Sequence, residues 1–426
     1  MSRILQLLRA ILRHPELAVY IRHVKILSSP SRPYKVAWQS PSHAMDWDKG
    51  HEAKEYTDVI KQSQAIVAKA KFPDSGKWNR ALQDGDPYAL VAILLSQCHN
   101  LRSLQLDYSF VWKSGFPGLM LKHALFSAPE GALSTFNRLT TVDYGGNVRP
   151  SELLEEIDDF DSAPGYPACD PDQFMAWFYL PSIRSLAIWL RNANDVISNK
   201  GQQSNLNQLH TLLLPRTTID EEEVPLLLSQ TTSLKTLHLG MAYRWREQCA
   251  LENGTCILQG LNSVNSVEKL SLALEYYPFT EGYYYFDSRK DHTLRKPFYG
   301  FLKQFPKLSS VEVPITLLLG LNAEATTKEV SKLLPSTLQE LCLHWDCSEL
   351  GSNPWWSQNQ LFCIVQHLLG NVKSHTPHLK RITVRIMNNK NPNSYLEERG
   401  EVQAMCGWTG IDMEVVFDEL SPGLWT

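Results

Sequence analysis

Residues 209–240, LHTLLLPRTTIDEEEVPLLLSQTTSLKTLHLG, hold two similar leucine-rich runs on either side of a short apolar segment. LHTLLL from Leu209 and LKTLHL from Leu234 share the pattern LxxLxL, whose alternating apolar residues favour half-buried strands. The intervening segment VPLLL follows four consecutive acids, which favour the start of a helix. The stretch therefore predicts a strand, a helix and a second strand that begins 25 residues after the first.

The same pattern, with Ile or Val allowed for Leu, recurs along the whole chain. Each match predicts a strand, and MEVVF at Met413 to Phe417 predicts a closing strand. Strand-helix repeats occupy about 20 to 29 residues, so the longer intervals between matches are expected to contain insertions. The ten matches start at Ile21, Leu101, Leu139, Ile183, Leu209, Leu234, Val267, Leu308, Leu338 and Leu379.

Apolar residues at helical spacing precede many of these strands. Such segments occur at 86–98, 173–179, 294–305, 329–334 and 355–372. The alternation predicts an α/β fold, namely a leucine-rich-repeat solenoid (horseshoe) of about ten irregular strand-helix repeats with long insertions. We expect residues 1–20 to form an N-terminal capping helix and residues 21–426 to form the repeat domain.

Two segments resemble fungal leucine-rich-repeat proteins of the F-box type. LLRAILRHPELAVYIRHVKI (residues 7–26) is similar to the part of those proteins that leads into the first repeat, and LLLPRTTIDEEEVPLLLSQTTSLKTLHL (residues 212–239) is similar to their internal repeats. The resemblance implies descent from a substrate receptor of a ubiquitin ligase. Only twenty residues precede Ile21, so we expect no F-box in this sequence and do not predict a ubiquitin-ligase scaffold as a partner. The repeat asparagine or cysteine occurs only at Asn147, Asn192, Cys347 and Asn388.

Bulk properties narrow the classes of partner. The formal net charge of -4 gives no reason to expect nucleic acid, and no apolar run is long enough to span a bilayer, so we predict no membrane partner. Eight cysteines without a CxxC pair predict reduced thiols in a cytoplasmic or nuclear protein. The basic N-terminus lacks the serine enrichment of a targeting presequence, so a docked first helix is favoured.

Two clusters invite a metal or catalytic interpretation. Asp220 to Glu223 precede a helix, where Thr218 with Glu221 or Asp220 with Glu223 would form a capping box, and we favour capping. LCLHWDC (residues 341–347) and the later Cys363 lack the paired spacings of structural zinc sites. Catalytic and phosphate-binding motifs are also absent. We predict no catalytic residue, no metal and no cofactor.

The other strand residues alternate away from the leucines and are expected to form a small, polar, concave face. These positions are Ser103, Gln105, Ser185, Ala187, Thr211, Leu213, Thr236, His238, Lys269, Ser271, Ser310, Glu312, Glu340, Cys342, Arg381 and Thr383. Beyond the strands lie aromatic-rich loops, which would gather along one rim of a solenoid. Their rings are Tyr34, Trp38, Trp47, Tyr108, Phe110, Trp112, Trp189, Tyr243, Trp245, those of 276–286, Trp345, Trp355 and Trp356.

Aromatic residues are enriched at interface hot spots. For any single ring we favour packing against other rings and helix ends, which would stabilise a long loop, and we expect some of the rim, especially Tyr283 to Tyr285, to be exposed. We predict non-catalytic protein recognition through the face and the rim. The alternative is an enzyme or small-molecule binder that uses a pocket between the aromatic loops. The candidate partner-binding residues are Tyr283, Tyr284, Tyr285, Trp245, Trp345, His238 and Arg381.

Overall fold

The computed structural model describes most of the chain in ten segments. They span residues 3–27, 51–112, 114–148, 170–193, 206–244, 254–277, 300–319, 330–344, 358–387 and 396–418.

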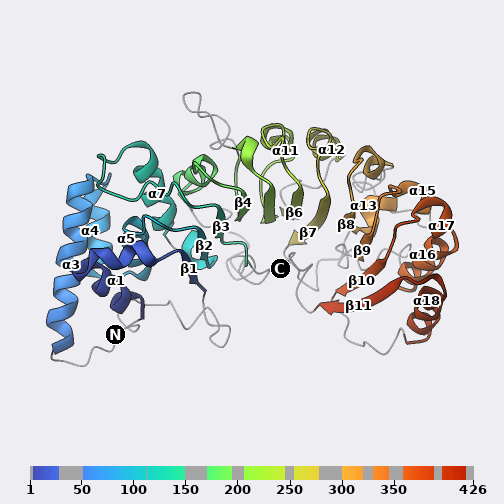
Figure 1. Cartoon of the computed structure of the whole chain (residues 1–426), viewed down its shortest axis with the longest axis horizontal. Helices are drawn as coiled ribbons and strands as arrows, with labels where there is room; N and C mark the ends of the chain where they lie inside the picture. Colours follow the sequence, from blue (N-terminus) through green and yellow to red (C-terminus); the bar gives the residue numbers. More distant parts are fainter. Residues whose placement is uncertain are drawn as a thin grey trace. The chain divides into compact units, whose positions relative to one another are not determined.

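Eleven strands form one parallel sheet whose strand order follows the chain order (Figure 1). Every LxxLxL match coincides with a strand, and the predicted closing strand is the eleventh. The prediction of an α/β chain is confirmed. The strands are β1 (His23–Ile26), β2 (Ser103–Leu106), β3 (Thr141–Tyr144), β4 (Ser185–Ile188), β5 (Thr211–Thr217), β6 (Thr236–Arg244), β7 (Lys269–Tyr277), β8 (Ser310–Pro314), β9 (Glu340–His344), β10 (Arg381–Met387) and β11 (Asp412–Asp418).

Helices or single helical turns connect the strands, and most predicted ones are present. Within 294–305 only the turn η5 (Phe301–Gln304) lies among the described residues. The main helices before β5 are α1 (Arg3–Arg13), η1 (Pro15–Tyr20), α3 (His51–Ala70), α4 (Ser75–Gln83), α5 (Pro87–Ser96), α6 (Ser109–Trp112), α7 (Phe116–Phe126), α9 (Asp172–Met175), η2 (Ala176–Tyr179) and η3 (Leu206–Gln208). After β5 come α11 (Glu223–Leu228), α12 (Thr255–Asn262), α13 (Ile315–Leu319), α15 (Val330–Leu333), α16 (Gln358–Gly370), α17 (Val372–His375) and α18 (Leu396–Thr409).

The chain divides into two compact units. The first comprises residues 1–147, 166–189 and 194–208, and it contains β1 to β4. The second comprises 148–165, 190–193 and 209–426, and it contains β5 to β11.

The core of the first unit is built around α5, in which every residue from Tyr88 to Ser96 is buried. Asp86 caps this helix by accepting the Tyr88 N–H at 2.7 Å, as its position before the apolar run predicts. Close packing also fixes α7 against α9, because a Cβ on Gly118 would lie 2.1 Å from the Gln173 carbonyl oxygen. Only glycine permits this approach.

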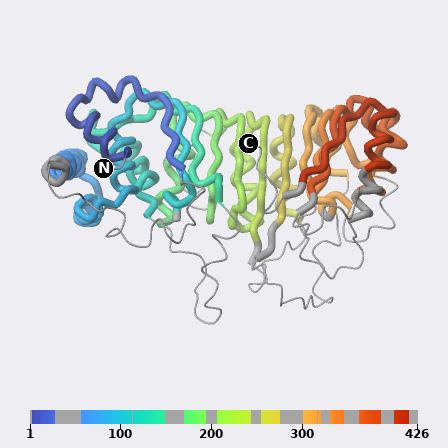
Figure 2. The backbone as a smooth tube through the Cα atoms, turned by 90° about the horizontal axis from the view of Figure 1, so that it is seen from below, coloured from blue at the N-terminus to red at the C-terminus, as the bar shows by residue number. Residues whose placement is uncertain are grey.

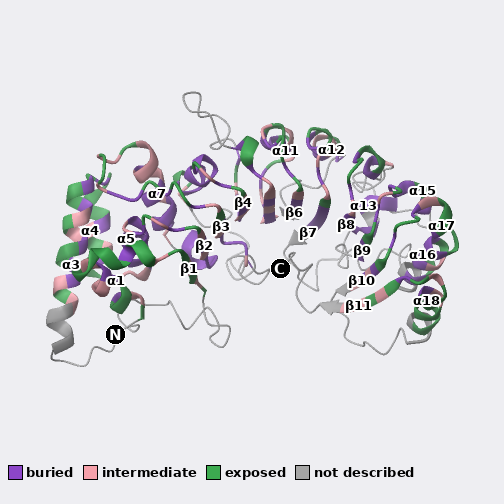
Figure 3. Cartoon of the chain, viewed as in Figure 1, coloured by how far each residue is buried: buried purple, intermediate pink, exposed green. Residues whose placement is uncertain are grey.

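In the second unit, leucine positions on one side of the strands are buried, among them Leu237 and Leu239 of β6 (Figure 3). The strands from β5 to β7 run side by side in register, except for a bulge in β5 between Leu214 and Thr217. Figure 2 shows the same strands as adjacent tubes. The alternation that predicted the strands is therefore the alternation of core and face.

One backbone contact repeats at the start of the strands. The carbonyl oxygen of Arg22 accepts N–H groups from Arg102 and Ser103 at 2.7 and 3.1 Å. The same contact occurs at the other adjacent strand pairs within each unit. In each pair, the carbonyl oxygen of the residue before one strand accepts an N–H from the start of the next strand. In the last pair, the Asp412 N–H donates to the carbonyl oxygen of Lys380 at 2.8 Å. This contact sets the register from one strand to the next.

The run of four acids from Asp220 to Glu223 ends at the first residue of α11, and Glu223 contributes to the start of this helix. Glu223 Oε2 accepts the N–H of Asp220 at 3.0 Å and that of Ala193 at 3.1 Å, while its own side chain is buried. This is the back-reaching half of the predicted Asp220–Glu223 capping box. The N–H of Glu223 donates to the backbone carbonyl oxygen of Asp220 at 2.9 Å, and the side chain of Glu222, the residue before α11, makes no capping hydrogen bond.

Candidate binding face

In the second unit, the strand residues between the leucines form two rows that cross the sheet, and we call this surface the polar face. The first row contains Thr211, Thr236, Lys269, Ser310, Glu340, Arg381 and Asp412. The second row contains Leu213, His238, Ser271, Glu312, Cys342, Thr383 and Glu414.

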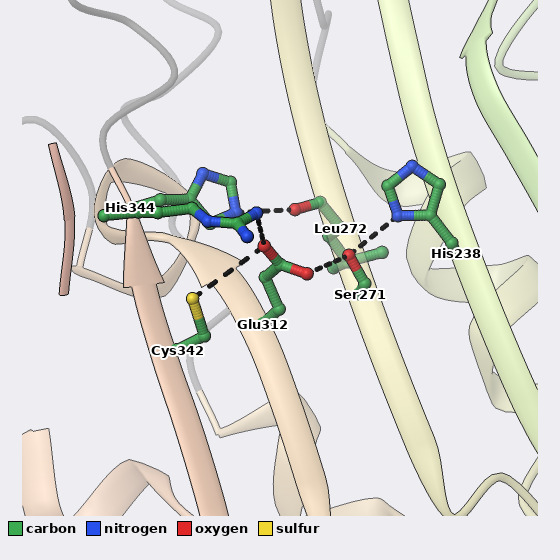
Figure 4. Close-up of polar contacts among 7 residues, drawn as sticks. His238, Ser271, Leu272, Glu312, Cys342 and His344 are labelled. Atoms are coloured by element: carbon green, nitrogen blue, oxygen red, sulfur yellow. Dashed lines mark hydrogen bonds and ion pairs between the residues drawn. The ribbon is translucent and has the colours of Figure 1, made fainter. Parts of the chain in front are cut away.

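The middle of the second row is a chain of hydrogen bonds across three strands (Figure 4). His238 Nδ1 lies 2.7 Å from Ser271 Oγ, and Ser271 Oγ donates to Glu312 Oε2 at 2.9 Å. Because the serine proton goes to the carboxylate, the histidine must donate its Nδ1 proton to the serine oxygen. This contact sets the tautomer of His238.

Residues of β9 and β10 continue the cluster. Arg385 forms an ion pair with Glu312, with Nη1 and Oε1 2.9 Å apart. Cys342 Sγ lies 3.8 Å from the same oxygen, and His344 Nε2 is 3.0 Å from the carbonyl oxygen of Leu272 (Figure 4). The polar cluster, as we call His238, Ser271, Glu312, Cys342, His344 and Arg385, thus joins β6 to β10.

The geometry of the cluster favours a structural role over nucleophilic catalysis. In a serine-based relay the histidine lies between the hydroxyl and the carboxylate, whereas here Ser271 lies between His238 and Glu312. Ser271 is only 1% exposed. The arrangement satisfies buried polar groups and links neighbouring strands.

This part of the polar face is buried, whereas the sequence pattern predicts that it is accessible. The sequence predicts His238 as an accessible partner-binding residue, but its side chain is buried. Ser271, Ser310 and Glu312 were also expected on an open surface and are likewise buried. Strand alternation tells which face a residue occupies, not whether other parts of the chain cover it.

The charge state of His238 follows from its surroundings. Burial, followed by the positive field of His344, Arg216 and Arg385, lowers the pKa of His238 to about 3. The imidazole is therefore neutral at pH 7 and carries its one proton on Nδ1, which donates to Ser271.

The first row differs from the second in its accessibility. Its four charged residues are all exposed: Lys269, Glu340, Arg381 and Asp412. They lie on β7, β9, β10 and β11, and Ser310 of β8 lies between the first two. Ser310 donates to Glu340 Oε2 at 3.1 Å. Arg381, the predicted partner-binding residue on β10, is thus on an accessible row of alternating charge.

The aromatic candidates have a mixed outcome. Tyr283, Tyr284, Tyr285, Trp245 and Trp345 lie outside the described residues. Three other rings of the predicted rim, Tyr108, Phe110 and Trp189, are buried in the first unit. They pack on other rings: Tyr108 contacts Trp189 edge-on with centroids 5.5 Å apart, and Phe110 contacts Tyr88 at 5.0 Å. For these three, the interpretation as rim contacts is wrong and the packing alternative is correct.

The first unit has its own smaller polar arrangement. Gln105 Nε2 donates to Asp143 Oδ2 at 2.8 Å, and burial raises the pKa of Asp143. Asn147, one of the predicted repeat asparagines, accepts the Tyr108 N–H and donates to Asp107 Oδ2, both at 2.8 Å. Its amide therefore joins two consecutive strand ends.

Metal ligands do not gather in the part of the chain that the structure describes. No group of three His, Cys, Asp or Glu side chains suited to a metal ion occurs among these residues. Cys342 and Cys363, considered above as ligands, form no disulfide bond within the described residues. Asp346 and Cys347 lie outside the described residues.

No described helix is long and apolar enough to cross a membrane.

Sequence reasoning placed most of the polar cluster on one face but did not assemble it. Arg385 was missed altogether, although it follows Thr383 at the strand period. The reason is that β10 continues beyond its LxxLxL match. Extending the period-two count past the sixth residue would have found it.

Comparison with known proteins adds no family. No protein-family model matches the chain, and a search of curated proteins found no match.

Proposed function

We propose that the protein is a leucine-rich-repeat scaffold that recognises another protein, without catalysis, through the polar face of its second unit. The observation that carries the proposal is the exposed first row, in which Lys269, Glu340, Arg381 and Asp412 alternate in sign beside the buried polar cluster. A row of mixed charge on a rigid sheet suits a partner surface with the complementary alternation, rather than a uniform polyanion.

The buried cluster supports this function indirectly. Glu312 and Arg385 are held by contacts across several strands, so the exposed residues beside them stand on a backbone with fixed spacing. Preorganisation of this kind reduces the entropy that binding must oppose. The two rows thus have different tasks, support for the second and contact for the first.

The strand pattern and the segments 7–26 and 212–239 also support a proposed kinship with F-box-type leucine-rich-repeat proteins. On this proposal the ligand is a folded protein or peptide of the cytoplasm or nucleus. An enzyme that uses a pocket between the aromatic loops is not favoured by any contact among the described residues.

The test compares proteins recovered with tagged wild-type protein and with Arg381→Glu. Reversing this charge should reduce recovery of the specific partner by about tenfold or more, since like charges across an interface oppose binding. Quantitative mass spectrometry measures the change. The matched control is Lys380→Glu, which alters an exposed cation one residue before the strand.

Equal recovery with both variants, or no protein that depends on the first row, would refute the proposed surface. Recovery of ubiquitin-ligase scaffold subunits would overturn the expectation that such a scaffold is not a partner. If these subunits are absent and Arg381→Glu loses a different partner protein, the result would support protein recognition without a ubiquitin-ligase connection.

A further inference from the structure

The two end strands of the sheet leave their core side incomplete. In β2, Leu104 and Leu106 are buried, but their neighbours in β1, Val24 and Ile26, remain partly exposed. At the other end, Val384 of β10 is buried whereas Val415 beside it in β11 is partly exposed. Each end therefore presents leucine-type positions that a further strand would cover.

Exposed apolar side chains accompany both ends. In the N-terminal segment 3–27, Tyr20 is 78% exposed, and Leu7, Leu17, Val19 and Leu27 are also exposed. In the C-terminal segment 396–418, Trp408 of α18 is 86% exposed. Of the large apolar residues exposed within the described chain, only Leu226 lies outside these two segments. Because the exposed large apolar side chains are concentrated in these two segments, the segments are candidate interaction surfaces.

The charges of the two ends are opposite. Segment 3–27 contains five Arg or Lys residues and one acid, Glu16. Segment 396–418 contains six acids and one base, Arg399. Because the chain as a whole has a net charge of only -4, this separation is local and makes the two ends complementary.

The register of the sheet sharpens the match. His23 is the first residue of β1 as Asp412 is the first residue of β11, and Lys25 and Glu414 each lie two residues further along their strands. If β1 of one copy followed β11 of another in the same parallel register, His23 would face Asp412 and Lys25 would face Glu414. The repeated backbone contact would place the N–H groups of Arg22 and His23 on the carbonyl oxygen of Ile411.

We infer that the protein associates head to tail with a second copy, with the β1 end of one molecule seated on the β11 end of the next. The interface is of the heterologous kind, in which two different surfaces of the same chain meet. Asp412 and Glu414 belong both to the polar face and to this end, but Tyr20 and Trp408 belong to neither row, so variants of these two residues test the association separately from partner recognition.

Two variants that each spoil one end test it. Tyr20→Glu introduces an acid at the N-terminal end, and Trp408→Glu adds an acid to the already acidic C-terminal end. Both side chains are highly exposed, so folding should be retained, and circular dichroism checks this. Analytical ultracentrifugation over a concentration series measures association. Wild-type protein should associate more strongly as salt is lowered.

Each variant alone should lose association by at least about tenfold in Kd, which corresponds to about 1.4 kcal/mol. Mixed together, the two should form a one-to-one dimer and nothing larger, since each supplies the end that the other lacks. Leu226→Glu, on α11, is the matched control and should behave as wild type.

Three results would overturn the inference. Wild-type protein that stays monomeric at every concentration would show that the charged end strands prevent pairing instead. Association that persists in Trp408→Glu alone would indicate contact between two N-terminal ends. Failure of the mixed variants to form a dimer, with wild type associating, would exclude the head-to-tail arrangement.

Discussion

Glu312 is the residue on which the polar cluster depends, since it binds Ser271 through one oxygen and Arg385 through the other. Ion pairs of this burial contribute little relative to apolar side chains, but removing one charge leaves the other without compensation. The cluster therefore enforces one alignment of β7, β8 and β10 more than it adds stability.

Glu312→Gln should lower the free energy of unfolding by about 3 kcal/mol, because Gln keeps the bond from Ser271 but leaves the Arg385 charge unbalanced. Adding Arg385→Met should restore part of the loss, with a coupling of about 1 to 3 kcal/mol in chemical denaturation. Glu268→Gln is the control. Its pair with Lys235 is 3.6 Å long and both side chains are about half exposed, so its effect should stay below about 1 kcal/mol. Additive effects of the first two substitutions would contradict the pairing.

His238 gives the unfolding equilibrium a defined pH dependence. Its pKa is about 3 when folded, against an ordinary value of 6.5, so the unfolded chain takes up a proton that the folded chain refuses. Stability is fully present above pH 6.5 and falls as the pH drops toward 3.

Between pH 7 and pH 5 this one group should remove about 2 kcal/mol from the free energy of unfolding. His238→Asn keeps a hydrogen-bonding group near Ser271 but cannot titrate. Between pH 7 and pH 5 its free energy of unfolding should therefore fall by about 2 kcal/mol less than that of the wild-type protein. Urea denaturation at the two pH values measures the difference. Identical pH dependence in the two proteins would show that the folded protein accommodates a charged imidazole.

At the scale of elements, helix α11 shows how one acid of four acquires a structural role. Glu223 is buried and accepts two backbone N–H groups, whereas its neighbour Glu222 is exposed. The four acids are indistinguishable as a run in the sequence, because only the approach of Ala193 separates them.

Glu223→Ala should therefore destabilise the second unit by about 1 to 2 kcal/mol through two unsatisfied N–H groups. Glu222→Ala, one residue away, should change stability by less than about 0.5 kcal/mol. Thermal unfolding of the two variants provides the comparison. Equal losses would assign the effect to the negative charge near the start of α11 rather than to the hydrogen bonds.

At the scale of the whole molecule, the ten LxxLxL matches predicted β1 to β10 and MEVVF predicted β11, because alternation reports burial directly. The same reasoning missed α3 and α4, which lie within the longest interval between matches and carry no repeat pattern. It also misjudged His238, which is buried through contacts with strands distant in sequence. Local periodicity thus gives the sheet, while the polar cluster and the ring contacts arise only from tertiary packing.

The agreement between strand order and chain order has a consequence for synthesis on the ribosome. Within each unit, a new strand emerges when the strand that it pairs with has already been made. Except for β2, which follows β1 only after the long interval that contains α3 and α4, each strand within a unit pairs with a strand made shortly before it, so most loop closures are short. The nascent chain can therefore grow its sheet by one edge at a time, and the exposed edge moves along with translation.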